Sequence, residues 1–125
     1  MVTASLPYVL QSSNYMVNIL PSTLQTRGLL SGDVLRHCAG EGSARRPRPP
    51  IFINAGRGDV VDEHALVTAL DSGWIGGAVH DVFQEEPLPK SSLLWSHDKV
   101  LMTPHISAVS YADDVAQLFA RNLAL

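Results

Sequence analysis

The sequence is poor in cysteine, in net charge and in long apolar runs. Cys38 is the only cysteine among 125 residues, which excludes an internal disulfide and a cluster of thiolate metal ligands and fits a reducing compartment. No run of about 18 apolar residues is present to span a bilayer. The formal net charge of −3 gives no electrostatic reason to expect a nucleic acid or an anionic membrane as partner.

The composition describes one small globular domain. Hydrophobic residues make up 46% of the chain and charged residues 17%, which is typical of a folded protein with a buried core. The length suits a single domain and is short for a complete enzyme with two substrates. Residues 1–11 contain no Lys or Arg before their apolar stretch. We therefore expect no secretory signal and a cytoplasmic protein.

Short apolar runs predict the strands of a sheet. Continuous apolar runs that alternate with helical segments indicate an α/β fold with a parallel sheet covered on both faces. The connection between the last two runs contains no clear helix. The runs are residues 15–20, 51–55, 78–82 and 100–103.

Caps and turn residues predict where the helices begin and end. Ser31 is expected to cap a short helix, and Asp62 to cap a second one that ends at Gly73. Ser110, followed three residues later by an Asp, resembles a capping box for the last helix. Residues 40–50 combine glycines, arginines and three prolines, which predicts a loop. The last helix carries apolar residues on one side: Val115, Phe119 and Leu123.

Polar residues beside Gly or Pro follow three of the predicted strands. In a parallel sheet all strand carboxyl ends lie along one edge, where open α/β sheets bind ligands. Held in one cleft, an Arg, a Glu and a His can bind a carboxylate-bearing substrate and move a proton at a neighbouring carbonyl. The three stretches are Asn-Ala-Gly-Arg-Gly-Asp-Val-Val at 54–61, Asp-Val-Phe-Gln-Glu-Glu-Pro at 81–87 and Thr-Pro-His at 103–105.

Each of these side chains also has an ordinary structural interpretation. Arg57 lies between glycines that allow unusual backbone angles and close approach of a ligand, yet a surface arginine in a tight turn has the same pattern. Glu86 before Pro87 is typical of a solvated loop. A lone histidine such as His105 is usually structural, whereas one in a cleft beside a carboxylate is a proton donor near neutrality. Asp81 ends a buried strand and therefore needs a partner, either backbone or ligand.

Two other kinds of site find no support in the sequence. Gly40 and Gly42 begin a pattern like the dinucleotide fingerprint, but they follow a helical segment instead of a strand, and Arg45 stands at the third glycine position. The spacing of the histidines predicts no metal site. His80 faces away from Asp81 along its strand and is interpreted as a packing residue.

The three stretches, together with Leu20-Pro21-Ser22-Thr23 and Thr26, resemble the second half of the NAD(P)-binding domain of the D-isomer-specific 2-hydroxyacid dehydrogenases. The glyoxylate/hydroxypyruvate reductase type is the most similar. The resemblance runs from about Asn14 to Asn122. It implies reduction of a small 2-oxo acid to a D-2-hydroxy acid with NADP or NAD as cofactor.

The resemblance also implies a role for each residue of the three stretches. Arg57 is expected to bind the substrate carboxylate and polarise the carbonyl, His105 to donate the proton, and Glu86 to keep that imidazole charged and oriented. Asp81 is expected to hold the nicotinamide carboxamide, and the loop around residue 20 to lie against the adenosine portion. The cofactor-binding residues implied in this way are Leu20, Pro21, Thr26, Asn54, Ala55, Gly56, Arg57 and Asp81.

The resemblance divides the chain into residues 1–13, which match weakly, and residues 14–125, a partial dinucleotide-binding domain. The expected fold is a Rossmann-like parallel sheet with flanking helices that lacks the first βαβ unit. One hypothesis is accordingly a truncated isoform of the dehydrogenase with little activity alone. The alternative is a non-catalytic fragment that associates with another copy or with a full-length relative through its exposed sheet edge.

Overall fold

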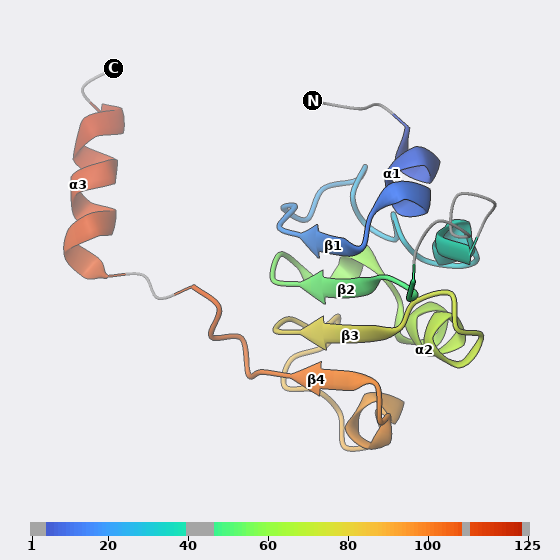
Figure 1. The fold of residues 1–125 in the computed structure, drawn as a ribbon. Coiled ribbons are helices and arrows are strands. Elements are labelled where there is room, and N and C mark those ends of the chain that lie inside the picture. Colours follow the sequence, from blue (N-terminus) through green and yellow to red (C-terminus); the bar gives the residue numbers. More distant parts are fainter. Residues whose placement is uncertain (1–4, 40–46, 109–110, 124–125) are drawn as a thin grey trace.

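The computed structural model describes residues 5–39, 47–108 and 111–123. Figure 1 shows a sheet with helices beside it and one helix standing apart. The strands are β1 (Tyr15–Asn18), β2 (Ile51–Asn54), β3 (Gly77–His80) and β4 (Val100–Met102). The α-helices are α1 (Leu6–Ser12), α2 (Glu63–Asp71) and α3 (Ala112–Leu123). Short 3-10 helices are η1 (Val34–Ala39), η3 (Gly58–Val60) and η4 (Leu93–Ser96).

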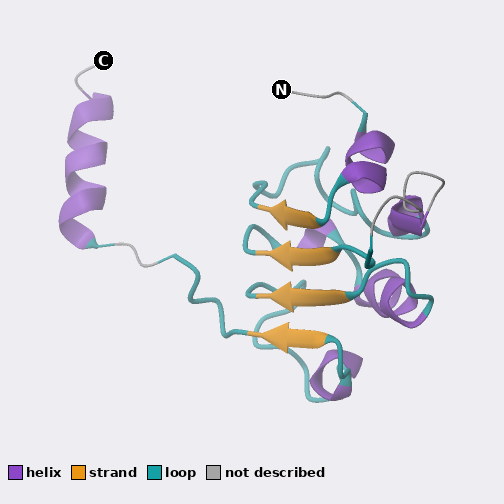
Figure 2. Cartoon of the chain, viewed as in Figure 1, coloured by secondary structure: helices purple, strands orange, loops and turns teal. Residues whose placement is uncertain are grey.

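The strands form one parallel sheet in the order β1-β2-β3-β4, as Figure 2 shows, which confirms the predicted α/β class. Their register places Met16, Phe52 and Ala78 side by side on one face. Each strand is added beyond the previous one in the same direction. Because crossovers between parallel strands are right-handed, all of these connections pass over the same face.

The core lies between that face and the helices. Met16, Phe52 and Ala78 are buried against Leu10 of α1 and Leu66 of α2, in a cluster that other buried apolar residues complete. Burying a large apolar side chain contributes about 1.5–3 kcal/mol to folding. The covered face therefore holds the strands, and with them the carboxyl edge, in place.

The opposite face of the sheet is not covered in the described part of the chain. Tyr15, Val17 and Leu101 point to that side, and each is more than half exposed. The expectation of helices on both faces is therefore wrong for the described residues. The physical reason is the strand order, which places every right-handed crossover on the other side.

Helix α3 forms where it was predicted but makes no core contact. None of its residues is buried, and Figure 1 shows it standing apart from the sheet. The proposed cap Ser110 lies outside the described residues, as do residues 40–46 of the predicted loop. None of the described helices is long and apolar enough to cross a membrane.

The other predicted caps have mixed outcomes. The carboxylate of Asp62 accepts a hydrogen bond from the Ala65 N–H at 2.7 Å, and Gly73 has a φ of 70°, so both ends of α2 are confirmed. Ser31 does not cap the following helix, because its hydroxyl accepts the Asp62 N–H at 2.9 Å. Helix α1 was not predicted. The sequence did contain a signal for it, because Ser5 can cap a helix and Pro7 is favourable in a first helical turn.

Candidate functional site

The centre of the candidate site is a carboxylate–imidazole pair. The Nδ1 atom of His105 lies 2.8 Å from Oε2 of Glu86. The second carboxylate oxygen, Oε1, accepts the Phe83 N–H at 2.8 Å. The His105 imidazole and the Phe83 N–H together lower the pKa of Glu86 below its ordinary value. Both side chains remain partly exposed, so the pair is accessible from solvent.

Asp81 holds the segment that carries His105. Its carboxylate accepts hydrogen bonds from the Thr103 hydroxyl and from the N–H groups of Ile106 and Ser107, the latter two at 2.9 Å. Burial alone would raise the pKa of Asp81, but these donors outweigh it and hold the pKa well below the ordinary range. The segment is thereby fixed on both sides of the histidine. Asp81 thus has the backbone partners that its position requires.

His105 itself has an unusual backbone conformation. Its φ is 54°, and it is the only non-glycine residue with a positive φ in the described part of the chain. The left-handed region is unfavourable for a residue with a Cβ, and such residues cluster at functional sites. The hydrogen bonds to Asp81 on either side of the histidine offset this strain. The sequence pattern Thr-Pro-His gave no indication of it.

Arg57 lies at the same edge but does not touch the pair. The residue is exposed, and its Nη1 donates to the Gly56 carbonyl oxygen at 2.7 Å. Within the described residues it makes no hydrogen bond or ion pair with Glu86 or His105. The structure therefore joins two of the three predicted catalytic residues directly and places the third on the neighbouring turn.

Gly56 and Gly58, on either side of Arg57, allow the backbones of separate chain segments to pack closely. Neither has a positive φ, so the unusual backbone angles that glycine permits are not used. A Cβ on Gly58 would lie 1.9 Å from the Phe83 carbonyl carbon, and one on Gly56 would lie 2.9 Å from the Leu20 nitrogen. The turn that carries Arg57 therefore packs against the 83–84 backbone, which leads directly into the Glu86 loop.

A buried amide pair fixes the ends of β1 and β2. The Asn18 Nδ2 donates to Oδ1 of Asn54 at 2.8 Å, and the Asn54 Nδ2 donates to the Arg57 carbonyl oxygen at 3.1 Å. The Oδ1 of Asn18 accepts the Leu20 N–H at 3.1 Å. Sequence reasoning missed Asn18. The available signal was an Asn at the end of each of two strands that prove to be neighbours.

The remaining cofactor candidates form the rim of the same edge. Leu20 and Pro21 are exposed, and Ala55 is half-buried. The Thr26 hydroxyl accepts the Thr23 N–H at 2.8 Å and donates to the Pro21 carbonyl oxygen at 2.6 Å. Thr26 thus shapes the loop that follows β1, with its hydroxyl bonded within that loop.

A cavity of about 560 Å³ opens beside the carboxylate–imidazole pair. Glu86 and His105 form its polar part, and the rest of the wall is mostly apolar. The indole N–H of Trp95 donates to the Pro89 carbonyl oxygen at 2.9 Å, which orients this half-exposed ring. The apolar part of the wall includes Phe83, Leu88, Trp95 and Met102.

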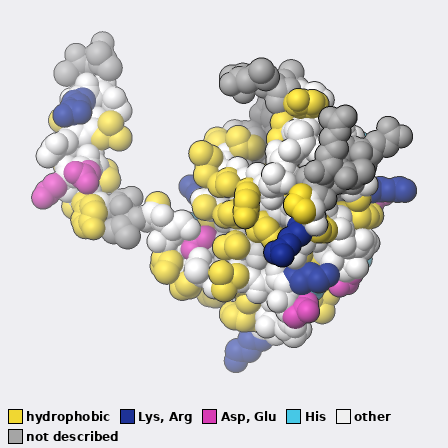
Figure 3. All heavy atoms as spheres, viewed as in Figure 1, with side chains coloured by type: hydrophobic (Ala, Val, Ile, Leu, Met, Phe, Trp, Pro, Cys, Tyr) yellow, Lys and Arg dark blue, Asp and Glu magenta, His cyan; other side chains and the backbone are white. Residues whose placement is uncertain are grey.

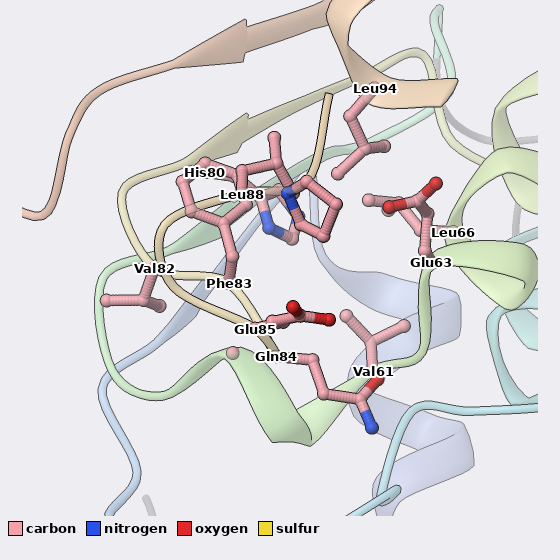
Figure 4. A pocket seen from close by; sticks show the side chains of 12 residues that line it. Val61, Glu63, Leu66, His80, Val82, Phe83, Gln84, Glu85, Leu88 and Leu94 are labelled. Carbon is pink, nitrogen blue, oxygen red and sulfur yellow. The ribbon is translucent and has the colours of Figure 1, made fainter. Parts of the chain in front are cut away.

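A second cavity, of about 390 Å³, lies on the covered side of the sheet (Figure 4). His80 lines it and packs edge-on against Phe52, with centroids 5.5 Å apart, as its predicted packing role requires. Burial lowers the pKa of His80 to about 4, so the ring is neutral at neutral pH. The described residues contain no group of three His, Cys, Asp or Glu side chains placed to hold a metal ion.

The sequence model of one family matches residues 1–107, and its description is D-isomer specific 2-hydroxyacid dehydrogenase, NAD binding domain. A glyoxylate/hydroxypyruvate reductase A from Salmonella paratyphi B is 38% identical over 115 residues, which cover 92% of this chain and 34% of that protein. The chain thus spans about a third of the length of the curated relatives that it matches.

Solved structures agree with the sequence matches. A D-isomer specific 2-hydroxyacid dehydrogenase from Xanthobacter autotrophicus Py2, in complex with NADPH and MES, has a TM-score of 0.81 at 43% identity and covers 95% of this chain and 46% of that one. An NADPH-dependent glyoxylate/hydroxypyruvate reductase from Sinorhizobium meliloti, in complex with NADP and sulfate, has a TM-score of 0.73 at 37% identity. It covers 95% of this chain and 36% of that chain.

Proposed function

The chain belongs to the D-isomer-specific 2-hydroxyacid dehydrogenase family, and on that premise we propose that its carboxyl edge carries the proton-transfer half of a reductase active site. The proposed reaction is the reduction of a 2-oxo acid of the glyoxylate or hydroxypyruvate type to a D-2-hydroxy acid with NADPH or NADH. The observation that carries this proposal is the 2.8 Å pairing of His105 with Glu86 beside an open cavity.

The pair is suited to giving a proton to a carbonyl oxygen. Because Nδ1 of His105 is held by Glu86, Nε2 is the ring nitrogen left to donate. The carboxylate stabilises the imidazolium before transfer and keeps the ring in one orientation. When bound, the reduced nicotinamide supplies the hydride to the substrate carbon. The protein's own step is proton donation to the oxygen, which completes the alcohol.

Arg57 is proposed to bind the substrate carboxylate. A guanidinium matches a carboxylate in bidentate fashion, and its exposure leaves donors available at the sheet edge. Its charge next to the 2-oxo group also polarises the carbonyl toward attack. The contact between Gly58 and the 83–84 backbone supports this assignment, because it keeps the turn beside the loop that carries Glu86.

The carboxyl edge offers surface for the two ends of a dinucleotide, but the 125 residues carry no glycine-rich turn for the pyrophosphate between them. Exposed Leu20 and Pro21, with half-buried Ala55, offer surface for the adenosine end, and the loop that Asp81 holds through Ile106 and Ser107 offers surface for the nicotinamide end. The 125 residues contain no Gly-x-Gly-x-x-Gly turn between a strand and a helix to cradle the pyrophosphate. We therefore propose that these 125 residues alone bind the cofactor weakly and have little activity.

The test is cofactor binding followed by turnover. Titration of the chain with NADPH and NADH is expected to give measurable binding in the millimolar range. In the presence of glyoxylate or hydroxypyruvate, any oxidation of NADPH is expected to be lost in His105→Asn and retained in His37→Asn, which changes an exposed histidine away from the edge. Absence of binding at millimolar cofactor, with the fold intact by circular dichroism, excludes catalysis by this chain alone.

A further inference from the structure

The cavity of about 390 Å³ on the covered side of the sheet has acidic side chains in its wall and no basic ones. Glu63 and Glu85 line it, and none of its lining residues is Lys or Arg. Figure 3 shows acidic and basic side chains together on the face of the protein in view, so this one-sided composition is a local feature. Cavities of this size bind small organic molecules, and the charge of the wall favours a cationic one.

His80 brings a buried polar atom to the wall of this cavity. The described part of the chain contains one buried side-chain nitrogen or oxygen atom without a hydrogen-bond partner, and it is Nε2 of His80. Figure 4 shows the His80 ring pointing into the cavity. A buried polar atom without a partner is costly, and a donor from a ligand would offset that cost. Nε2 therefore marks the position for one polar group of a ligand.

The state of the His80 ring decides what kind of group that is. Burial lowers the pKa of His80 to about 4, and a hydrogen bond with the Val82 backbone partly offsets this effect. A bond that favours the protonated ring is one that the ring itself donates. The neutral ring has a single N–H, so Nε2 keeps its lone pair as an acceptor. The ligand must therefore bring a hydrogen-bond donor to this end of the cavity.

The two carboxylates differ in what they can offer a ligand. Glu63 is half-buried, and its oxygens accept the Ser92 hydroxyl at 2.7 Å and the Leu93 N–H at 2.9 Å. Glu85 is exposed, and its carboxylate has no hydrogen-bond or ion-pair partner among the residues that the structure describes. In Figure 4 it points into the cavity. Glu85 is therefore the carboxylate available to pair with a cationic group.

Apolar side chains form the wall between these polar groups. No set of three His, Cys, Asp or Glu side chains in the described residues is placed to hold a metal ion, so a bare divalent cation does not fit the cavity. A ligand that meets both His80 and Glu85 has to span an apolar space, which a ring on a short alkyl chain fills. The apolar wall includes Val61, Leu66, Phe83, Leu88, Pro89 and Leu94.

We propose that this cavity binds an arylalkylamine that carries a hydroxyl group on its ring. The ammonium group pairs with Glu85 in the negative field of Glu63, and the ring hydroxyl donates to Nε2 of His80. A neutral hydroxyl suits the buried end, because an ammonium group placed there would lose its hydration. The proposal is independent of the proposed function, since it uses neither Arg57 nor the carboxylate–imidazole pair.

The first experiment titrates the labelled chain at neutral pH with tyramine and two analogues, monitored by nuclear magnetic resonance. Tyramine is expected to shift the ring signals of His80 and to saturate with a Kd of about 0.1–1 mM, as for other ligands of this size. Phenethylamine lacks the hydroxyl and is expected to bind about three- to tenfold more weakly. 4-Hydroxyphenylacetate has a carboxylate in place of the ammonium group, and we expect the acidic wall to exclude it.

The second experiment repeats the titrations with two variants and a matched control. His80→Leu removes the acceptor and is expected to make tyramine and phenethylamine bind equally. Glu85→Gln changes an exposed residue and is expected to weaken tyramine binding about threefold at low salt. Asp114→Asn removes an exposed carboxylate on the separate helix α3 and is expected to keep the wild-type affinity.

Three results overturn the proposal. Tyramine may saturate nothing at His80, so that its ring signals stay unchanged, or 4-hydroxyphenylacetate binds as tightly as tyramine. The preference for tyramine over phenethylamine could also persist in His80→Leu, which excludes Nε2 as the acceptor. Should His80→Leu fail to fold, Glu85→Gln decides, because an unchanged tyramine affinity in that variant contradicts the pairing of the ammonium group with Glu85.

Discussion

The two faces of the sheet have similar apolar residues but different surroundings. On the covered face Met16, Phe52 and Ala78 are buried beneath helices, whereas Val17 and Leu101 on the other face are more than half exposed. The connections between consecutive strands can cover only one face when strand order follows chain order. Covering the second face therefore requires chain that does not connect these strands.

A similar contrast separates the polar residues at the carboxyl edge. Asn18 and Asn54 end neighbouring strands, are buried and bond to each other, so they hold the edge together. Glu86 and His105 lie beyond the strand ends and remain partly exposed. Burial therefore distinguishes the polar groups that support the edge from those that can meet a substrate.

The largest expected effect is on folding stability, when one large apolar side chain is shortened on each face of the sheet and the two losses are compared. Phe52→Ala removes a ring that is 1% exposed and is expected to cost about 3–5 kcal/mol in the free energy of unfolding. Leu101→Ala is expected to cost less than about 1 kcal/mol, because this side chain is 63% exposed. Urea denaturation monitored by circular dichroism measures both. Equal losses would contradict the one-sided packing.

The next effect tests the contact that keeps the Arg57 turn beside the Glu86 loop. Gly58→Ala places a Cβ 1.9 Å from the Phe83 carbonyl carbon and is expected to cost about 2–3 kcal/mol through forced backbone movement. The control Gly73→Ala has free space but a φ of 70°, and its expected cost is about 1 kcal/mol. A Gly58→Ala variant as stable as the wild type would show that the two loops are not in close contact.

The smallest effect concerns the pH dependence of folding stability, which we attribute to His80 on the covered side of the sheet. Because the folded-state pKa of His80 is about 4 and the ordinary value is 6.5, the unfolded chain binds the extra proton first as pH falls. The neutral ring therefore contributes its full stability above about pH 6.5, and this contribution is lost as the pH falls from 6.5 toward 4. At pH 5 the expected loss in the free energy of unfolding is about 2 kcal/mol. His80→Leu is expected to flatten this part of the stability profile. An unchanged slope in the variant would rule out His80 as its source.

Local signals in the sequence predicted much of the fold. Asp62 and Gly73 bound α2 because a side-chain cap and a left-handed glycine act within a few residues. The apolar runs located the strands for the same reason. The Ser31 cap failed because its hydroxyl is used by a residue far along the chain, and no local pattern reports such a contact.

The candidate site was predictable in its chemistry but not in its geometry. Spacing and resemblance selected Glu86 and His105, and the structure joins them directly. The positive φ of His105, the three donors to Asp81 and the Asn18–Asn54 pair depend on the alignment of neighbouring strands. That alignment is a tertiary property, so these features became apparent only in the folded structure.

The most direct test of the proposed site is a nuclear magnetic resonance titration of the labelled chain with hydroxypyruvate and NADPH. If the three residues form one substrate site, the signals of Arg57, Glu86 and His105 shift together and saturate at one concentration, while the signal of His80 in the second cavity stays unchanged. A shift of His105 without Arg57, or perturbations centred on His80, would contradict the claim that the three residues at the carboxyl edge form a single substrate site.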